Sequence, residues 1–568
     1  MVRISGEFNS LSRHCASALA DKRNQKPPAF AGLEKNSEAS LRGMKAELPH
    51  SSGVILMLPG LSLHSQKNTN MEVIALTNTL LQGLQQASII ENTKGGEYYA
   101  TTYDSNLDFF SGVGRFDDEE KVEAVFSAAY GEDRETSLAN LLYTLDIRGG
   151  KGERKIFKAA FRWLCHRHPS DAVEIMHRIP EYGRWDYVLE AADTPVWYEA
   201  VNMISRQLFL DCSLDHPSLL AKWLPSVKTH GKRNPLAKRL AEELKMSEKE
   251  YRKLLSELRS RINIVEKQMS EGRFDDIDFE KVPSKAMMKY RRAWREHAGD
   301  SYRDYLDSVQ AGEKKVNTNG LFCYEIVKRA GFRGYMPECS DEDARLADLM
   351  WKNQKDFLEG NRANVLAMAD TSGSMTWPDM LPMANSVGLA IYTAERNHGF
   401  FHNYFMTFSD RPCLQKVSGE TITEKLANIK SIIADTNIDA AFEMLLNTAV
   451  DNGIPQEDMP SHIIIISDME FDRGVMSRRG TNLSGWKKTF KDAGYTLPAV
   501  IFRNVAGRIG GTPATKNDRD VCMISGFSTS VLSHILDLEN YSPVATMMEI
   551  LEPYRKVLGF SKEDKTRD

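Results

Sequence analysis

The stretch that decides the fold of this 568-residue chain is Val365-Leu366-Ala367-Met368-Ala369-Asp370-Thr371-Ser372-Gly373-Ser374. A short apolar run that stops at a turn predicts a buried strand. One carboxylate and two hydroxyls, from Asp370, Ser372 and Ser374, follow on this single turn. The carboxyl end of a strand is the binding edge of a doubly wound sheet, and hard oxygen atoms are the ligands of small divalent cations. The stretch therefore predicts a metal site.

The sequence around this stretch alternates between apolar strands and helical segments. The pattern predicts elements over residues 364–369, 380–397, 402–408, 421–433, 437–450, 462–467, 484–493, 496–502, 521–525 and 528–537. Such alternation is typical of parallel βαβ units. The run from Ile463 to Ile466 is apolar throughout, as expected where helices cover both faces of a parallel sheet. We predict a doubly wound, mainly parallel, Rossmann-like domain over residues 360–560.

Two further segments place oxygen ligands just after a strand or at a helix start. They are Thr436, within Asp435-Thr436-Asn437, and Asp468, within Ser467-Asp468-Met469-Glu470-Phe471-Asp472. The order of the three segments and their spacing, 66 and then 32 residues, resemble the von Willebrand factor A family and its metal-ion-dependent adhesion site. The resemblance covers most of residues 360–560.

The resemblance implies an octahedral site with three hydroxyls and two carboxylates, which bind directly or through water: Ser372, Ser374, Thr436, Asp370 and Asp468. Mg²⁺ is the expected cofactor, because it prefers oxygen ligands and leaves a coordination position for a partner's carboxylate or phosphate. Such a site would bind rather than react. The sequence departs from the family at Met469, where many relatives carry Gly, which puts the shape of the loop in question but not the ligands.

A structure without metal also explains each segment taken alone. Asp370 would cap a turn, Thr436 would N-cap a helix starting near Ile438, and Asp468 would end a strand. All three segments in the family's order favour the metal site. The nearby charges Glu470 and Asp472 would either hold metal-bound waters or be solvated loop residues, and the second interpretation is favoured.

The first half of the chain is helical in pattern from about residue 107 to 330. Segments 137–146, 153–167, 171–178 and 185–192 are joined by short connections. Ser247 and Glu250 form a capping box ahead of apolar residues at helical spacing. We predict a HEAT-like α-solenoid over residues 85–345, although the lack of an exact repeat period leaves a compact bundle open. Residues 1–80 are expected to be a disordered leader, with a first helical pattern at 73–84.

Basic side chains gather in this helical half. Residues 221–300 hold 20 Lys and Arg against 13 Asp and Glu, a net +7, so the rest of the chain sums to −12 from a total of −5. Two clusters are candidate contacts for RNA phosphates. The first follows a glycine-rich turn and the second lies downstream of it: Arg148, Lys151, Arg154, Lys155, Lys158 and Arg162, then Lys228, His230, Lys232, Arg233, Lys238 and Arg239. A solvated helix face is the alternative.

Three aromatic residues, Tyr290, Trp294 and Tyr302, lie among further basic residues. They could stack on unpaired bases, as in proteins that bind single strands, but core packing is the favoured interpretation.

The two halves together resemble the Ro autoantigen class of RNA-binding proteins, whose helical part is the TROVE module. The resemblance rests on Tyr98-Tyr99-Ala100-Thr101-Thr102, on Ile147-Arg148-Gly149-Gly150-Lys151-Gly152 and on Ile179-Pro180-Glu181-Tyr182-Gly183-Arg184-Trp185-Asp186. The stretch from Leu224 to Ser284 is closer to uncharacterised relatives that share the two-part layout. The resemblance implies a ring of helical repeats closed by the A domain, with single-stranded RNA ends in its centre and duplex stems on a basic outer face.

The composition excludes several classes of protein. The longest apolar stretch, Gly53 to His64, is too short to cross a bilayer, and seven cysteines without a C-x-x-C pair argue against a disulfide framework or zinc site. We expect a cytoplasmic protein with no membrane partner. No Walker A, zincin, nucleophile-elbow or EF-hand motif is present, so an enzyme is not expected.

The leading hypothesis is a non-enzymatic protein that binds small structured or misfolded RNA on its helical half. Its A domain would use Mg²⁺ to dock a partner's carboxylate or to close the ring. The alternative is a metal-dependent protein-interaction scaffold without RNA, and a metal-dependent nuclease is the weakest of the three, because it would need a second ion or a positioned base.

Overall fold

The computed structural model describes residues 89–91, 97–227, 233–262, 264–334, 337–408, 411–430, 436–471, 482–507, 511–536 and 541–560. The expected leader, 1–80, and the helical pattern at 73–84 lie outside these stretches. Within them, no helix has the length and apolar character needed to cross a membrane.

The part of the chain before residue 353 is helical apart from one small hairpin, β1 (Ile89–Glu91) and β2 (Glu97–Tyr99). Its helical elements are α3 (Ser105–Leu107), the π-helix η2 (Asp108–Gly112), α4 (Glu119–Glu132), α5 (Arg134–Leu145), α6 (Arg154–Arg167), α7 (Pro169–Tyr182), the 3-10 helix η3 (Trp185–Ala191), α8 (Trp197–Ser213), α9 (Leu220–Trp223), α10 (Arg233–Glu243), α11 (Glu248–Arg261), α12 (Val265–Ser270), the 3-10 helix η4 (Phe279–Lys281), α13 (Ser284–His297), α14 (Gly299–Gln310), α15 (Cys323–Arg329) and α16 (Asp341–Lys352).

The helix predicted from its capping box is present as α11. The Ser247 hydroxyl accepts a hydrogen bond from the Glu250 N–H at 3.3 Å, and the Glu250 carboxylate accepts one from the Ser247 N–H at 2.8 Å. These bonds satisfy donors that the first turn leaves without intrahelical partners. The segment expected at 185–192 is a 3-10 helix rather than an α-helix.

The part after residue 360 contains a six-stranded sheet. Its elements are β3 (Val365–Asp370), the 3-10 helix η5 (Gly373–Thr376), α17 (Leu381–Arg396), β4 (Tyr404–Phe408), β5 (Cys413–Lys416), α18 (Ile422–Asn428), α19 (Ile438–Asp451), the 3-10 helix η6 (Gln456–Asp458), β6 (His462–Ser467), α20 (Asn482–Asp492), β7 (Ala499–Asn504), β8 (Val521–Ser525), α21 (Leu532–Ile535) and α22 (Pro543–Val557). The combination of a helical half with an α/β half confirms the predicted α plus α/β layout.

The strand order is β5-β4-β3-β6-β7-β8, and every neighbouring pair is parallel except β4 with β5. The chain moves from β3 to β4 and β5, crosses back to β6 and then continues in the opposite direction through β7 and β8. This reversal places the topological switch point between β3 and β6, and ligands of open α/β sheets bind outside the strand ends at such a point. The short edge strand β5 was not predicted, because its four residues form no apolar run.

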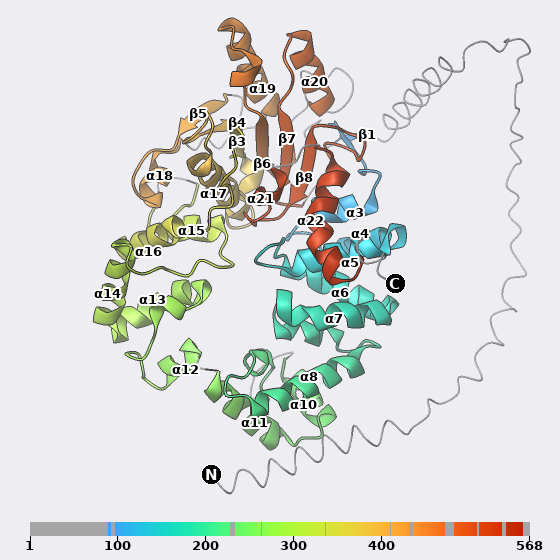
Figure 1. The fold of residues 1–568 in the computed structure, drawn as a ribbon, viewed down its shortest axis with the longest axis vertical. Coiled ribbons are helices and arrows are strands. Elements are labelled where there is room, and N and C mark those ends of the chain that lie inside the picture. Colours follow the sequence, from blue (N-terminus) through green and yellow to red (C-terminus); the bar gives the residue numbers. More distant parts are fainter. Residues whose placement is uncertain are drawn as a thin grey trace, which may run out of the picture.

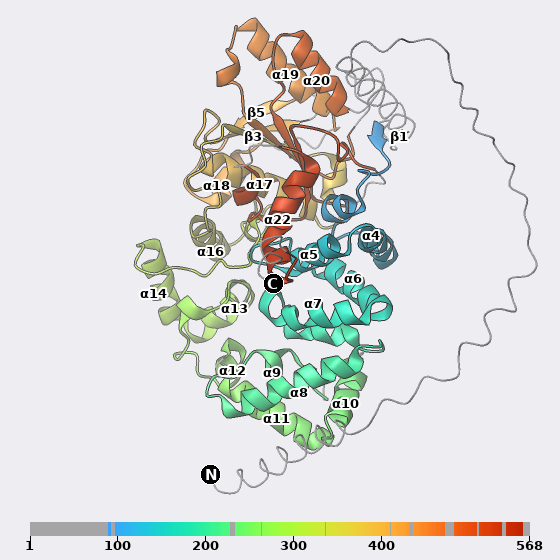
Figure 2. The same ribbon diagram turned by 45° about the vertical axis from the view of Figure 1, so that its right-hand side comes forward.

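The helices α4 to α16 follow a curved path, and both ends of this path meet the sheet domain, so the chain traces a ring (Figure 1). At one end η2 packs on β8 and α5 packs on α22, an arrangement that we call the first seam. At the other end α15 and α16 pack on α17 and α18, which we call the second seam. The turned view in Figure 2 shows the sheet domain above the helical arc, with α22 descending from the sheet onto α5.

The first seam contains a buried lysine. Lys151 is only 1% exposed, and its ammonium donates hydrogen bonds to the carbonyls of Phe110 at 3.2 Å and Val113 at 2.7 Å. The Ser525 hydroxyl, at the end of β8, donates to the same two carbonyls at 2.8 and 3.1 Å. Gly526 follows with φ +98°, and a Cβ there would lie 2.9 Å from Lys151 Cγ, so a side chain at this position would disrupt the seam.

Arg115 joins three separate parts of the chain beside this lysine. Its guanidinium donates to the Glu153 carboxylate at 2.7 and 3.0 Å and to the Tyr324 hydroxyl of α15 at 3.3 Å. It also lies 3.5 Å from the ring centroid of Phe527, just after β8. The early helices, the end of the helical arc and the sheet domain therefore meet at one side chain.

The second seam is held by fewer buried polar contacts. The Trp351 indole N–H donates to Glu395 at 2.7 Å, and the same carboxylate pairs with Lys425 at 2.6 Å. The N–H of Ile422 donates to Asp348 at 3.2 Å. These contacts fix α16 to α17 and α18.

We predict that the stability contributed by Lys151 depends on pH. Burial lowers its pKa from 10.5 to about 8, so between these values the unfolded chain holds a proton that the folded protein has lost. Stability should rise with pH in this window, by about 1.4 kcal/mol per pH unit at most. The thermal midpoint of the wild type minus that of Lys151→Met should therefore increase between pH 7 and 10. The exposed Lys155→Met is the control, and a difference that does not change with pH would contradict the prediction.

Candidate metal site and RNA-contact residues

The strand ends bring the two predicted carboxylates to the switch point. Ala369 of β3 pairs with Ile466 of β6, so Asp370 and Asp468 follow at adjacent strand ends. Both carboxylates are 0% exposed. The chain reaches this arrangement because each apolar strand ends where the sheet ends and the next residues are polar.

Asp370 is held by hydrogen bonds on both oxygens. Oδ1 accepts from the Ser372 N–H at 2.8 Å, and Oδ2 accepts from the Ser467 hydroxyl at 2.5 Å. Burial, and after it the Asp468 charge, raises the pKa of Asp370 well above its ordinary value, and the bonds from Ser467 and Ser372 oppose this only in part. Two carboxylates are therefore buried close enough to repel one another.

Asp468 has one oxygen that lacks a donor. Its Oδ1 accepts from the Glu470 N–H at 3.1 Å, whereas Oδ2 is buried and has no hydrogen-bond partner among the described residues. An unpaired buried carboxylate oxygen is costly, and native structures usually satisfy such an atom with water or an ion.

The hydroxyls of the predicted ligand set come from two other segments. Ser372 Oγ and Ser374 Oγ lie 3.1 Å apart on the turn after β3. Thr436 is buried directly before α19. The N-cap of α19 is Asn437, whose side chain accepts from the Ala440 N–H at 3.0 Å, so the expectation that Thr436 would cap this helix in a metal-free structure is wrong.

The donor set fits a small hard cation. The predicted set comprises two buried carboxylates and three hydroxyls, and within the described residues one carboxylate oxygen has no partner. Mg²⁺ prefers such oxygen ligands, and its charge would offset the repulsion between the carboxylates. The described residues contain no group of three or more His, Cys, Asp or Glu side chains that could hold a metal, so any cation here would depend on the hydroxyls.

The loop after Asp468 explains the departure at Met469. This residue has φ 67°, the left-handed region in which Gly carries no steric cost, and its side chain is buried. The Tyr98 hydroxyl donates to the Met469 carbonyl at 2.7 Å and accepts from the Phe471 N–H at 2.7 Å. Packing and these bonds hold the loop in a conformation that Met disfavours. Glu470 is half-buried, and Asp472 lies outside the described residues.

The glycine-rich turn is not a surface for RNA at Lys151. This prediction is wrong, because the ammonium is buried in the first seam and bonded to two carbonyls. The backbone N–H groups of Lys151 and Glu153 are also occupied, since they donate to the carbonyls of Tyr143 and Thr144. A Cβ on Gly150 would lie 2.2 Å from the Tyr143 carbonyl oxygen, so the glycine serves close packing.

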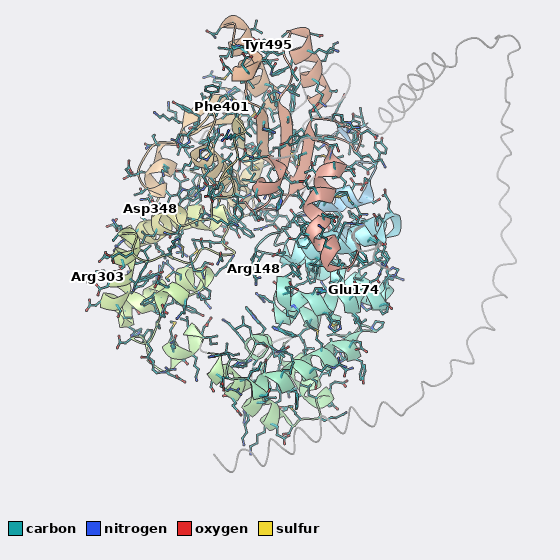
Figure 3. The ribbon with its side chains drawn as sticks, in the orientation of Figure 1. Arg148, Glu174, Arg303, Asp348, Phe401 and Tyr495 are labelled. Carbon is teal, nitrogen blue, oxygen red and sulfur yellow. The ribbon has the colours of Figure 1, made fainter. Side chains whose placement is uncertain are left out.

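Most other basic candidates are paired with acids. Lys158 pairs with Glu190, Arg162 with Glu119 and Glu190, Lys238 with Glu248, and Arg239 with Asp193. Such pairs reduce the local positive charge that would attract phosphates. Three candidates are exposed and form no ion pair within the described part of the chain: Arg148, Arg154 and Lys155. Figure 3 places Arg148 at the edge of the open middle of the ring.

The remaining candidates are not described. Lys228, His230 and Lys232 lie outside the described residues, as does the side chain of Arg233. The three aromatic residues pack in the core, as the favoured interpretation of the sequence predicts. Trp294 and Tyr302 are buried, and Tyr290 packs against Trp294 with ring centroids 6.1 Å apart.

Three residues that hold the candidate metal site were missed from the sequence. Ser467 bonds Asp370, Tyr98 bonds the loop after Asp468, and Lys328 of α15 pairs with Asp379, five residues after Ser374. Ser467 could have been suspected from its place beside Asp468. No local pattern connects Tyr98 or Lys328 to the site.

Each half of the chain matches a family model. A domain of unknown function, DUF2828, matches residues 92–181 and 210–359, and another, DUF7788, matches residues 364–564. The uncharacterized protein L728 of Acanthamoeba polyphaga mimivirus is 30% identical over 512 residues, covering 82% of this chain and 87% of the viral protein. This chain belongs to the same family as L728. The aligned region is too long to fit within one half, so the family shares both. None of these names states an activity or a ligand.

We predict that the stabilities of Met469→Gly and Met469→Ala will differ in the order opposite to the usual one. Met469→Ala loses the buried side chain and keeps the strained φ, whereas Met469→Gly loses the same side chain and relieves the strain. The Gly variant should be more stable than the Ala variant by about 1 kcal/mol. Denaturant unfolding measures the difference. At a position with ordinary φ the Gly variant is the less stable of the two. If the Gly variant is also the less stable one here, Met469 is not strained.

Proposed function

We propose that this protein is a non-enzymatic, Ro-like RNA-binding protein whose sheet half is a von Willebrand A-type domain that uses Mg²⁺ to dock an acidic partner. Metal-dependent docking is the part of this function that the geometry supports best. The observation that carries it is the buried Asp468 Oδ2, which has no donor in the part of the chain that the structure describes although it lies beside a second buried carboxylate.

The residues of this chain would contribute two kinds of oxygen ligand at this site. Asp370 and Asp468 would supply the negative charge, and Ser372, Ser374 and Thr436 the neutral oxygens. A bound cation would supply a positive centre with a coordination position left for a partner's carboxylate or phosphate. Ser467 would keep Asp370 oriented through its 2.5 Å bond.

The path of the chain supports the Ro-like part of the proposal. Helices pack on helices that lie one or two places along the chain, such as α4 on α5 and α6, and α6 on α7, as in a HEAT-like solenoid. The sheet domain then closes the arc at the two seams (Figure 1). A ring closed by an A-type domain is the layout that the resemblance to the Ro class implies.

The RNA surface in this proposal is smaller than the sequence predicts. Arg148, Arg154 and Lys155 remain as exposed cations, and Arg148 borders the middle of the ring (Figure 3). The ion pairing of the other candidates favours a second candidate function, a metal-dependent protein scaffold without RNA. The nuclease hypothesis gains no support, because a second set of acidic ligands is not found among the described residues.

We predict that Asp468→Asn removes the response to Mg²⁺. The wild type should unfold at a higher temperature in millimolar Mg²⁺ than in EDTA, because binding to the folded state stabilises it. The variant should show no such rise, and in EDTA it should be at least as stable as the wild type, because one of two repelling charges is gone. Asp451→Asn, at the exposed end of α19, is the matched control. An equal Mg²⁺-dependent rise in both variants would exclude the site.

We predict that Arg148→Glu, Arg154→Glu and Lys155→Glu together weaken binding to structured RNA by on the order of tenfold or more. The slope of log affinity against log salt should fall by about two to three, because fewer counterions are released. The control is Lys416→Glu, Lys488→Glu and Lys491→Glu, the same charge change on exposed residues of the sheet domain. Equal loss in both triple variants, or wild-type binding no stronger than that of a charge-matched acidic protein, would decide against RNA in favour of the scaffold.

A further inference from the structure

Both loops that flank the candidate metal site are held by side chains from outside the sheet domain. The loop after Asp468 is held by Tyr98 of β2, and the turn after Ser374 is held by Lys328 of α15. Both residues lie within the DUF2828 matches and not within the DUF7788 match.

Tyr98 fixes the loop after Asp468 at two points. Its side chain is 2% exposed, and its hydroxyl bonds the Met469 carbonyl and the Phe471 N–H, each at 2.7 Å. These two groups bracket the segment whose Met469 has a strained φ of 67°. Because Asp468 is the residue directly before Met469, the Tyr98 bonds also restrict where the Asp468 carboxylate lies.

β2 has its own attachment to the sheet domain, which positions Tyr98. The Tyr99 N–H donates to the Thr512 carbonyl at 3.0 Å, and the Thr512 N–H donates to the Tyr99 carbonyl at 2.8 Å. Two backbone bonds next to Tyr98 limit its movement. The hydroxyl is therefore presented to the loop by a strand that is itself bonded to the sheet domain.

Lys328 performs the matching role on the other side. Its ammonium donates to the Asp379 carbonyl at 2.9 Å and pairs with the Asp379 carboxylate. Asp379 and Met380 have φ 53° and 57°, so the connection from η5 to α17 is a tight, left-handed turn. Ser372 and Ser374 belong to the short stretch between β3 and this turn.

We propose that Tyr98 and Lys328 are positioning residues for the metal site, so that cation binding is coupled to the closure of the helical half on the sheet domain. The inference rests on the Mg²⁺ site proposed above. Coupling between two binding events is reciprocal: if a closed ring raises cation affinity, the cation must stabilise the closed ring by the same factor.

Calorimetric titration of the full chain with Mg²⁺ tests the first half of this coupling. Tyr98→Phe removes only the hydroxyl and should weaken Mg²⁺ binding by about fivefold or more, and Lys328→Met should act in the same direction. Tyr554→Phe is the matched control. Like the Tyr98 hydroxyl, the Tyr554 hydroxyl is buried, and it donates to Asp146 at 3.0 Å. It lies at the first seam and bonds neither metal-site loop. It should lower the unfolding temperature and leave the Mg²⁺ affinity unchanged.

Hydrogen exchange tests the reciprocal half. Mg²⁺ should slow exchange of the Tyr99 and Thr512 amides in the wild type and not in Tyr98→Phe. If Tyr98→Phe binds Mg²⁺ as the wild type does, or if Tyr554→Phe weakens binding equally, the positioning role is wrong while the metal site stands. If the wild type binds no Mg²⁺, the proposed function itself fails, and the inference fails with it.

Discussion

Two backbone carbonyls, those of Phe110 and Val113, each accept hydrogen bonds from Lys151 and from Ser525, and this shared bonding fixes the sheet domain on the first helices. The lysine comes from the helical half and the serine from the end of β8, so neither half alone satisfies the junction. Burying an ammonium is costly unless it is hydrogen bonded. The contact therefore selects one arrangement of the two halves, and Arg115 reinforces it by bonding Glu153 and Tyr324 while stacking on Phe527.

The candidate metal site depends on the pairing of β3 with β6 for its geometry and on burial for its electrostatics. Two carboxylates at adjacent strand ends, both removed from water, destabilise the protein unless a positive charge or a proton joins them. The sheet topology brings them together, and the Ser467 hydroxyl and the Ser372 N–H orient the Asp370 carboxylate without neutralising its charge. A cation bound between the two carboxylates would offset their repulsion.

The sequence predicted the sheet half well because its signals are local. Strands β3, β6 and β8 and the helices between them follow from apolar runs and turns, and α11 follows from its capping box. The missed features are those that depend on distant partners. Lys151 has the surroundings of a phosphate-binding turn, and only its position against β8 shows that it is buried. Met469 departs from the Gly of the resembled family and so indicates an unusual loop, but the support of this loop by Tyr98 spans 371 residues and leaves no local pattern.

The separation of the first seam in sequence has a consequence for biosynthesis. Ser525 and Phe110 are 415 positions apart, so their contact cannot form until nearly the whole sheet domain has left the ribosome. Until then η2 lacks the packing that β8 later provides. Closure of the ring is thus a late step in the synthesis of each chain. The helical half is open before this step, and the finished protein can return to that open form only by breaking its first seam.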